Sequence, residues 1–371
     1  MADYIVNNSD IQSVIDHASA NGGGRVIIEG HILAESMIIL KSNVELHLPI
    51  GSVLEAPGDL EAYPDYEPEL ARAEDGFAPE KGRKCFIAAD CAENIAITGG
   101  GTIEMNGTRF YDTTKLGFRN FFYEKPEYPR PRMLELVGCR NVRIENTSFL
   151  NSPSWSFWLV DCEEMFIRGI RLTGDPRLPN NDGIHMDTCR NTMISDCFIS
   201  TGDDSIVVRC IRKRSDREYR SCNITITNCV LHSLCHGIRI GCPSDGIIRN
   251  VTVSNCVLTG QTGIGFGNPE MYLHNVKGRL FAESIRIQNV TVEVDGVPLS
   301  IYVDKGLALE KLGDIRFTNC DFRGKRPAFL QGWEEGFPIG PLTFDSVRFN
   351  QMPQITGCKD LQFKDVEIAA E

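Results

Sequence analysis

The 371-residue chain lacks several features that would place it in other classes of protein. It has no run of about 18 consecutive apolar residues, which a membrane-spanning helix needs. Its first residues, MADYIVNNSD, contain neither the basic region nor the apolar stretch of a secretory signal. Positive charge is also scarce, since 38 Lys and Arg face 50 Asp and Glu, for a net charge of −12. We therefore expect no nucleic-acid partner and no membrane partner.

The fourteen cysteines form no Cys-x-x-Cys pair and are scattered through a large chain, unlike the cysteines of a small disulfide-bonded scaffold. Four of them fall at the same place in a repeat, directly after an Asn or Asp: Cys197, Cys229, Cys256 and Cys320. This position favours an inward stack of small apolar side chains over metal ligation. We predict reduced thiols, no metal, no cofactor and a cytoplasmic location.

A short repeat of the form apolar-x-apolar-x-Asn/Gly runs through the chain from residue 142 onward. Clear copies begin at Val142, Met165, Ile224, Val251, Ile285 and Ile315, and looser ones at Thr192 and Leu342. Successive copies begin 23 to 34 residues apart. Period-two strands repeated at such intervals are typical of stacked coils, in which equivalent residues lie about 4.8 Å apart. The repeat predicts an all-β solenoid, a parallel β-helix.

A solenoid grows by adding coils, so we predict one domain over residues 1–371. Residues 1–30 would form an N-terminal cap, in which Ser9–Ala20 is a short amphipathic helix that covers the apolar end. Regular coils would occupy residues 133–371.

Two stretches, residues 57–84 and 105–132, show no repeat and are predicted to be irregular loop excursions. The second interleaves arginines with aromatic residues. Long insertions in solenoids tend to lie on the functional face. We predict that residues 105–132 wall a substrate groove, and packing at an oligomer interface is the alternative.

Four segments align without gaps and predict which side chains stack on neighbouring coils: DGIHM from Asp182, DSIVV from Asp204, HGIRI from His236 and TGIGF from Thr262. The alignment places Asp182, Asp204 and His236 in one column, with Asp203 next to Asp204. Three carboxylates and one imidazole on one face can supply the general acid and general base that cleavage of a glycosidic bond requires. Carboxylates packed together also favour one protonated and one ionised group.

Neighbouring columns supply candidate substrate-binding residues. His185 and Arg239 share one column, and Arg209 lies in the next. A looser copy, Leu299-Ser-Ile301-Tyr302-Val303, would place Tyr302 in the His185 column. His185 is equally compatible with a plain surface position.

At these residues the chain resembles glycoside hydrolase family 28, the polygalacturonase family. The resemblance rests on IQSVIDHASANGGGRVIIEG near the N-terminus and on three motifs. Asn180-Asn181-Asp182-Gly183, Gly202-Asp203-Asp204 and Cys235-His236-Gly237 stand for the family's Asn-x-Asp-Gly, Gly-Asp-Asp and Gly-His-Gly. Each motif alone is a common turn sequence. Their order on a repeat scaffold makes the resemblance specific.

The resemblance implies a single-stranded right-handed parallel β-helix that hydrolyses α-glycosidic bonds with inversion. Asp203 would be the general acid, Asp182 and Asp204 would hold the attacking water, and His236 would tune the acid or touch the substrate. Asn180 would shape the turn and line the substrate site. We expect a galacturonate-containing oligosaccharide or small glycoside, trimmed from one end, because a cytoplasmic enzyme meets imported fragments and not polymer.

One departure from the family leaves the sugar open. The family carries an Arg-x-Lys pair on the coil after its His, where this chain has Gly265 and Gly267. Either Arg239 and Arg209 grip the substrate carboxylate instead, or a rhamnose-containing or neutral sugar fills the room that the glycines leave. Two further classes are a β-helix polysaccharide lyase, with unsaturated products, and a noncatalytic carbohydrate-binding β-helix.

Overall fold

The computed structural model describes residues 2–74, 84–268, 279–303, 309–332 and 339–369. Residues 75–83 of the predicted excursion 57–84 lie outside this set. Within the predicted single domain, contacts gather into two compact units. Unit 1 comprises Met1–Ala71, Lys81–His185 and Thr192–Asp203, and unit 2 comprises Arg72–Glu80, Met186–Asn191 and Asp204–Glu371.

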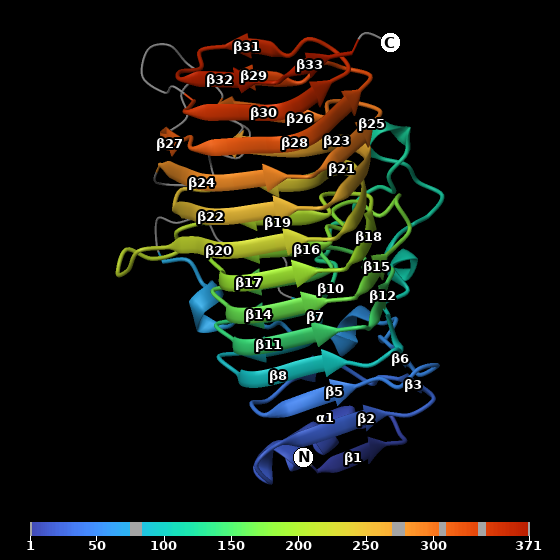
Figure 1. The fold of residues 1–371 in the computed structure, drawn as a ribbon. Coiled ribbons are helices and arrows are strands. Elements are labelled where there is room, and N and C mark those ends of the chain that lie inside the picture. Colours follow the sequence, from blue (N-terminus) through green and yellow to red (C-terminus); the bar gives the residue numbers. More distant parts are fainter. Residues whose placement is uncertain (1, 75–83, 269–278, 304–308, 333–338, 370–371) are drawn as a thin grey trace. The chain divides into compact units, whose positions relative to one another are not determined.

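Unit 1 consists of parallel strands stacked coil on coil in three rows (Figure 1). The first row contains β1 (Asp3–Val6), β2 (Gly24–Ile28), β5 (Val44–His47), β8 (Glu93–Thr98), β11 (Arg140–Glu145) and β14 (Glu163–Arg168). The second contains β3 (His31–Leu33), β6 (Val53–Glu55), β9 (Thr102–Glu104), β12 (Ser148–Leu150), β15 (Arg171–Thr173) and β18 (Phe198–Thr201). The third contains β4 (Ile38–Ile39), β7 (Cys85–Asp90), β10 (Arg132–Val137) and β13 (Phe157–Val160).

Unit 2 repeats the same three rows (Figure 1). The first holds β20 (Arg220–Thr227), β22 (Ile247–Ser254), β24 (Leu280–Gln288), β28 (Ile315–Gly324), β30 (Leu342–Phe349) and β32 (Leu361–Lys364), with β27 (Leu309–Leu312) also beside β24. The second holds parts of β21 (Val230–Ile240), β23 (Val257–Asn268), β28 and β30, with β25 (Thr291–Val294) and β33 (Glu367–Ile368). The third holds β19 (Ile206–Arg209), the ends of β21 and β23, β26 (Leu299–Val303), β29 (Phe329–Gln331) and β31 (Gln354–Thr356). In sequence, β16 (Ile184–Asp187) and β17 (Arg190–Ser195) span the passage between units.

These rows confirm the predicted parallel β-helix. Among their described residues, the irregular excursions carry short 3₁₀ turns, η1 (Leu60–Ala62), η2 (Glu69–Ala71), η3 (Gly107–Phe110) and η4 (Phe118–Asn120). An isolated antiparallel bridge also joins Leu116 to Tyr123.

The predicted N-terminal helix is α1 (Ile11–Ala20). The Asp10 carboxylate accepts a hydrogen bond from the Ser13 backbone N–H at 3.2 Å, which caps the first turn. Ile11, Ile15 and Ala18 share its buried face, which packs against the first strands of unit 1. Among the described residues, no helix has the length and apolar content to cross a membrane.

The final residue of each repeat explains why the motif ends in Asn or Gly. All eight such residues have φ between 50° and 64°, a left-handed conformation that Asn and Gly tolerate best. In unit 2 their amides also form a ladder, in which Asn255 donates to Asn228 at 3.3 Å, Asn289 to Asn255 at 3.1 Å and Asn319 to Asn289 at 2.8 Å. The motif therefore marks the turn that starts each new strand.

The four repeat cysteines point into the core, as predicted, and are 1–3% exposed. Each thiol lies 3.1–3.3 Å from the carbonyl oxygen two residues earlier. All fourteen cysteines are free thiols.

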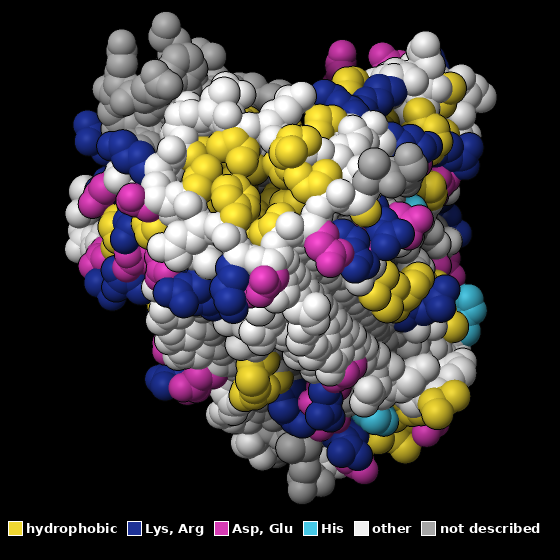
Figure 2. All heavy atoms as spheres, turned by 45° about the horizontal axis from the view of Figure 1, so that its top comes forward, with side chains coloured by type: hydrophobic (Ala, Val, Ile, Leu, Met, Phe, Trp, Pro, Cys, Tyr) yellow, Lys and Arg dark blue, Asp and Glu magenta, His cyan; other side chains and the backbone are white. Residues whose placement is uncertain are grey.

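The last coils of unit 2 stack aromatic rings along the core. Phe317 and Phe344 lie 4.9 Å apart between centroids, and Phe344 and Phe363 lie 5.2 Å apart. Phe363 is 48% exposed, with Met352 and Ile368 exposed nearby in sequence. Hydrophobic side chains accordingly gather on the C-terminal end, which Figure 2 brings forward. The described residues leave this end of the aromatic ladder uncovered.

Candidate active site

Unit 1 brings two of the predicted catalytic carboxylates together. An oxygen of Asp182 lies within 4.8 Å of an oxygen of Asp203. Asp182 is buried, whereas Asp203 is half-buried. Two carboxylates this close repel each other when both are ionised, which favours a state in which the pair holds one proton. The arrangement suits general acid/base chemistry.

The turn at Asn180 and Asn181 holds Asp203 in place. The Asn181 side-chain oxygen accepts hydrogen bonds from the backbone N–H groups of Gly202 at 2.8 Å and Asp203 at 3.1 Å. Asn180, with φ of 59°, donates from its amide to Asp203 Oδ2 at 3.3 Å. Sequence reasoning assigned Asn180 to substrate binding and missed Asn181. Both residues position the carboxylate, and the contact of Asn180 with a substrate stays a prediction.

His185 lies beneath Asp182. It is 4% exposed, its ring stacks on Trp155 with centroids 4.3 Å apart, and its Nδ1 lies 3.3 Å from Asp182 Oδ2. The alternative of a plain surface residue is therefore wrong. The stacked imidazole orients Asp182, and its predicted contact with a sugar has no support in this geometry.

The excursion 105–132 packs against the loop that carries Asn180. The Arg130 guanidinium donates to the Pro179 carbonyl at 2.6 Å, to the Asn180 side-chain oxygen at 3.2 Å and to the Tyr111 hydroxyl at 2.7 Å. The Tyr111 hydroxyl donates in turn to the Pro153 carbonyl at 2.6 Å. These bonds fix the excursion against the loop that carries Asn180, and its role as a groove wall stays a prediction.

The same excursion contributes a cation that sequence reasoning did not single out. Lys125 is exposed, but partial withdrawal of its ammonium from water, and then the Arg130 charge, lower its pKa, while Asp203 and Asp182 oppose this effect. The ammonium therefore lies within electrostatic reach of both carboxylates. The density of arginines and aromatic residues around position 125 was the available signal.

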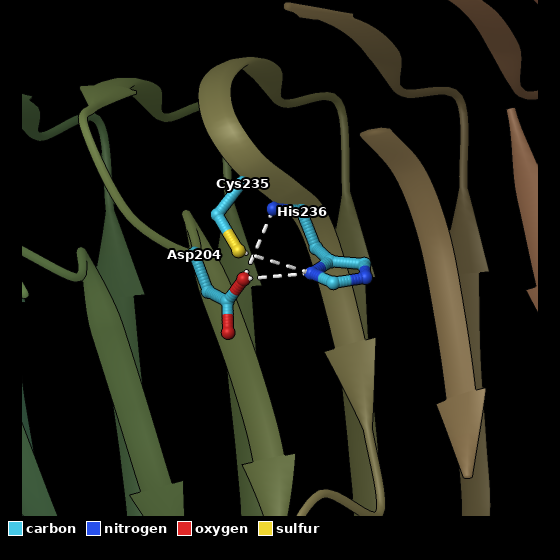
Figure 3. Close-up of side chains that lie close together, drawn as sticks. All are labelled: Asp204, Cys235 and His236. Carbon is cyan, nitrogen blue, oxygen red and sulfur yellow. Dashed lines mark hydrogen bonds and ion pairs between the residues drawn. The ribbon is translucent and has the colours of Figure 1, made fainter. Parts of the chain in front are cut away.

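Unit 2 contains two more of the predicted catalytic residues, the carboxylate Asp204 and the imidazole His236 (Figure 3). Asp204 Oδ1 accepts from the His236 backbone N–H at 2.9 Å and lies 3.0 Å from the ring Nδ1. Arg239 donates to Asp204 Oδ2 at 3.0 Å. Burial opposes ionisation, but Arg239 and then His236 outweigh it, so the pKa of Asp204 lies well below its usual value. Asp204 is therefore ionised at neutral pH.

The strand register of unit 2 confirms the predicted columns. Ile206 pairs with Ile238, and Val207 with Arg239. On the next coil, His236 pairs with Thr262 and Arg239 with Gly265. The register shifts between Ser233 and His236, and this irregularity at the start of the HGIRI segment re-aims the imidazole.

The predicted place of Tyr302 is wrong by two residues. Ser300 pairs with Gly265, and Tyr302 pairs with Gly267. Leu299, and not Ile301, stands opposite Ile264. Because a strand repeats every two residues, both apolar residues fit the pattern and the sequence did not decide between them. Tyr302 thus belongs to the column of Arg209 and not to that of His185.

Gly265 and Gly267 are predicted to leave room for a bulkier sugar, but the structure contradicts this prediction. A Cβ atom on Gly265 would lie 2.6 Å from Cδ2 of His236, so the imidazole occupies that space. Gly267 has φ of 123°, and a Cβ there would clash with the Tyr302 carbonyl oxygen. The His236 ring and the local backbone thus explain why glycine, and not Arg or Lys, occupies these two positions.

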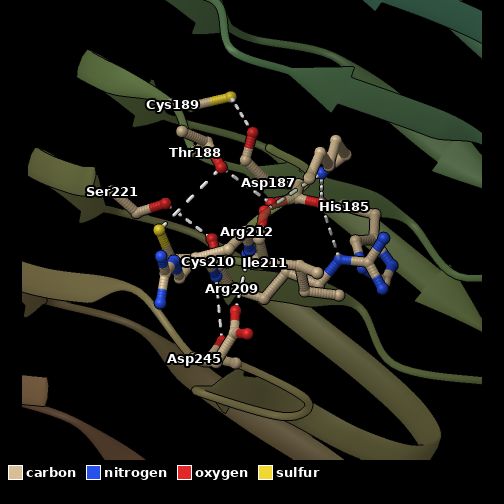
Figure 4. A network of polar contacts seen from close by, with 12 residues as sticks. His185, Asp187, Thr188, Cys189, Arg209, Cys210, Ile211, Arg212, Ser221 and Asp245 are labelled. Carbon is tan, nitrogen blue, oxygen red and sulfur yellow. Dashed lines mark hydrogen bonds and ion pairs between the residues drawn. The ribbon is translucent and has the colours of Figure 1, made fainter. Parts of the chain in front are cut away.

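Arg209 lies inside unit 2 and pairs with a buried carboxylate (Figure 4). It is 3% exposed, and its Nε lies 3.4 Å from Asp187 Oδ2. Lys213 donates to the same oxygen at 2.7 Å. Burial opposes ionisation of Asp187, but Lys213 and then Arg209 outweigh it and hold its pKa well below the usual value. Arg209 has a structural role here, and its predicted grip on a substrate carboxylate has no support in this geometry.

Comparison with known proteins identifies the family of the chain. The model of glycosyl hydrolases family 28 matches residues 70–266, more than half of the chain. A probable polygalacturonase of Vitis vinifera is 32% identical over 54% of this chain, and the match spans 40% of that protein. An endo-polygalacturonase of Pectobacterium carotovorum is 25% identical over 99% of this chain and 88% of its own length. An exopolygalacturonase of Thermotoga maritima shares the fold with a TM-score of 0.76 at 21% identity, over 98% of this chain and 92% of that one.

The fold is a right-handed parallel β-helix, and the family match places it among glycosidases. The chain belongs to glycosyl hydrolases family 28.

Proposed function

We propose that this protein hydrolyses α-glycosidic bonds in galacturonate-containing, pectin-derived oligosaccharides. The observation that carries the proposal is the Asp182–Asp203 pair, held by the Asn180–Asn181 turn on a family 28 scaffold. The names of its relatives supply the substrate class.

The surroundings of the carboxylates suggest their roles. Asp204 faces Arg239 and His236, so it stays ionised and cannot donate a proton near neutral pH. It suits the task of holding and activating water. Asp203 is half-buried and contacts an uncharged amide, and its partner carboxylate favours retention of one proton. We assign Asp203 as the general acid and Asp182 as a second group that holds the water.

We propose that the anomeric configuration is inverted, as the family resemblance implies. The distance between the two carboxyl groups bears on this proposal. It is usually about 6.5–9.5 Å in inverting enzymes and about 5–5.5 Å in retaining enzymes. The Asp182–Asp203 oxygens, within 4.8 Å, lie nearer the second range. The configuration of the first product is therefore the decisive measurement.

Two cations are candidates to bind the uronate carboxylate. Arg239, 14% exposed at its side chain, is anchored by Asp204 in unit 2. Lys125 lies within electrostatic reach of Asp182 and Asp203 in unit 1. We propose that both contribute. The absence of the Arg-x-Lys pair favours a second candidate substrate, a rhamnose-containing or neutral glycoside of the same linkage class.

We propose that the enzyme acts from one end of the substrate. The anchored excursion 105–132 would prevent a long oligosaccharide from extending past the carboxylates in both directions. The relatives include both endo- and exo-acting enzymes. Fourteen free thiols support the proposed cytoplasmic location, where thiols stay reduced.

The test is hydrolysis of short galacturonides, rhamnogalacturonan fragments and neutral α-oligosaccharides, with product anomers followed by proton NMR. Asp203→Asn should lower the rate by about 10²–10⁴-fold. Asp216→Asn, an exposed site, is the matched control and should keep full activity. If only neutral oligosaccharides are cleaved, the substrate is a neutral glycoside and not a galacturonide. Absence of turnover on every substrate, despite binding, would contradict the proposed hydrolysis of these classes.

A further inference from the structure

Three different metal-binding groups meet at one point in unit 2 (Figure 3). The Cys235 thiol lies 3.3 Å from His236 Nδ1, and His236 Nδ1 lies 3.0 Å from Asp204 Oδ1. The Cys235 thiol is also one of the groups that lower the pKa of the Asp204 carboxylate. All three ligand atoms lie within 4.8 Å of one another.

This triangle has nearly the shape that a tetrahedral zinc ion imposes on its ligands. Zinc binds carboxylate oxygen, imidazole nitrogen and thiolate at about 2.0, 2.1 and 2.3 Å, so tetrahedral angles place nitrogen and oxygen about 3.3 Å apart and sulfur and nitrogen about 3.6 Å apart. The observed distances of 3.0 and 3.3 Å each need to widen by about 0.3 Å. Small side-chain rotations would achieve this.

The second oxygen of Asp204 remains with Arg239, at 3.0 Å, so metal binding need not break that ion pair. Arg239 also places a positive charge beside the ion, which weakens binding but does not remove a ligand. Two anionic ligands, Asp204 and the Cys235 thiolate, balance the charge of a divalent ion. Three protein ligands leave a fourth position for water or substrate.

We propose that Asp204, Cys235 and His236 form a zinc site and that zinc occupancy inhibits the enzyme. Binding converts the Cys235 thiol to a zinc-bound thiolate and releases its proton to solvent, so affinity rises with pH. The metal would hold two groups that the hydrolysis needs, Asp204 and His236. Inhibition therefore rests on the proposed function, whereas metal binding does not.

Metal binding is measured first, without substrate, by titrating the reduced, metal-free full-length protein with zinc against a chromophoric chelator. Titration with Co²⁺ reports the thiolate ligand through its charge-transfer absorption. Cys235→Ser should weaken zinc binding by more than the roughly 10–100-fold that loss of an outer-shell partner causes. Cys91→Ser is the matched control, because Cys91 is exposed and lies 3.2 Å from Asp90, yet belongs to no three-ligand cluster among the described residues. It should leave binding unchanged.

Activity is measured second. Zinc should inhibit the wild type and Cys91→Ser, and Cys235→Ser should stay active and resist zinc. Equal zinc affinity in Cys235→Ser, or a cobalt complex without thiolate absorption, would overturn the metal site. If zinc binds through Cys235 but leaves turnover unchanged, the inhibitory role is wrong and the site stands. If the wild type binds zinc in this way but cleaves no substrate, the proposed function fails and the inhibitory role fails with it, while the site stands.

Discussion

The buried cluster around Asp187 predicts an asymmetric response to mutation. Asp187 is 0% exposed and holds two cations, Lys213 at 2.7 Å and Arg209 at 3.4 Å. Its other contacts are the Thr188 hydroxyl at 2.9 Å and the Ile211 backbone N–H at 3.0 Å. Asp187→Asn removes the charge that both cations contact. We expect a loss of about 3–5 kcal/mol in the free energy of unfolding, as for other broken buried ion pairs.

Lys213→Met should cost less, because Asp187 then keeps Arg209, Thr188 and Ile211. The loss is that of a hydrogen bond between charged groups, about 1.5–3 kcal/mol. The double variant should lose less free energy of unfolding than the two single variants lose together, and the difference should be about 0.5–3 kcal/mol. Urea unfolding at pH 7, followed by circular dichroism with slopes compared across variants, measures all three.

The pH dependence of the same variants gives an independent check. The folded pKa of Asp187 lies below that of the unfolded chain, about 3.9. Its contribution to stability is thus complete above that value and is lost as the pH falls below it. The difference between wild type and Asp187→Asn should therefore shrink below about pH 4. An equal or larger cost for Lys213→Met than for Asp187→Asn would refute the idea that Arg209 shares this carboxylate.

Three further predictions concern the site and the coils. Arg209→Met should lower stability by about 1.5–3 kcal/mol without raising KM, and a raised KM at unchanged stability would restore its predicted substrate contact. Arg239→Met should raise the pKa of Asp204 and move the acidic limb of the kcat/KM profile to higher pH. If the limb does not move, ionisation of Asp204 does not control the rate. Asn255→Ala should destabilise the fold by about 1–3 kcal/mol, more than Asn255→Gly, because only alanine is strained at φ of 54°. Urea midpoints decide the first and third, and a pH–rate series decides the second.

The periodic part of the fold could be predicted from the sequence because one physical constraint repeats on every coil. Asn and Gly at left-handed turns, as at Asn255 and Asn289, fix where each strand begins. Gapless segments such as DSIVV and HGIRI then fix the register, which is observed. Prediction failed at Tyr302, where period two allowed two registers and the sequence offered an apolar residue for each.

Prediction also failed where a residue's role depends on what lies across the core. The column pattern put Arg209 in the column of Asp187, but it did not show that Lys213 would bind the same carboxylate and that the cluster would be buried. Likewise, no sequence pattern indicated the Trp155 ring that stacks on His185. Stacking within a column follows from sequence, whereas burial depends on loops that carry no repeat.

Neighbouring acidic residues acquire different chemistry from these surroundings. Asp204 faces a guanidinium and an imidazole, which fix it as an anion. Asp203, the preceding residue, instead lies beside the Asn180 amide and the Asp182 carboxylate, and it shares the influence of the Lys125 ammonium with Asp182. A pair of carboxyl groups whose environments separate their protonation states is what acid/base hydrolysis requires. The Asp-Asp dipeptide gives no hint of this difference, because the residues that create it come from positions 180, 182, 236 and 239. The proposed assignment of acid and base thus depends on residues outside the Asp-Asp dipeptide and not on the motif alone.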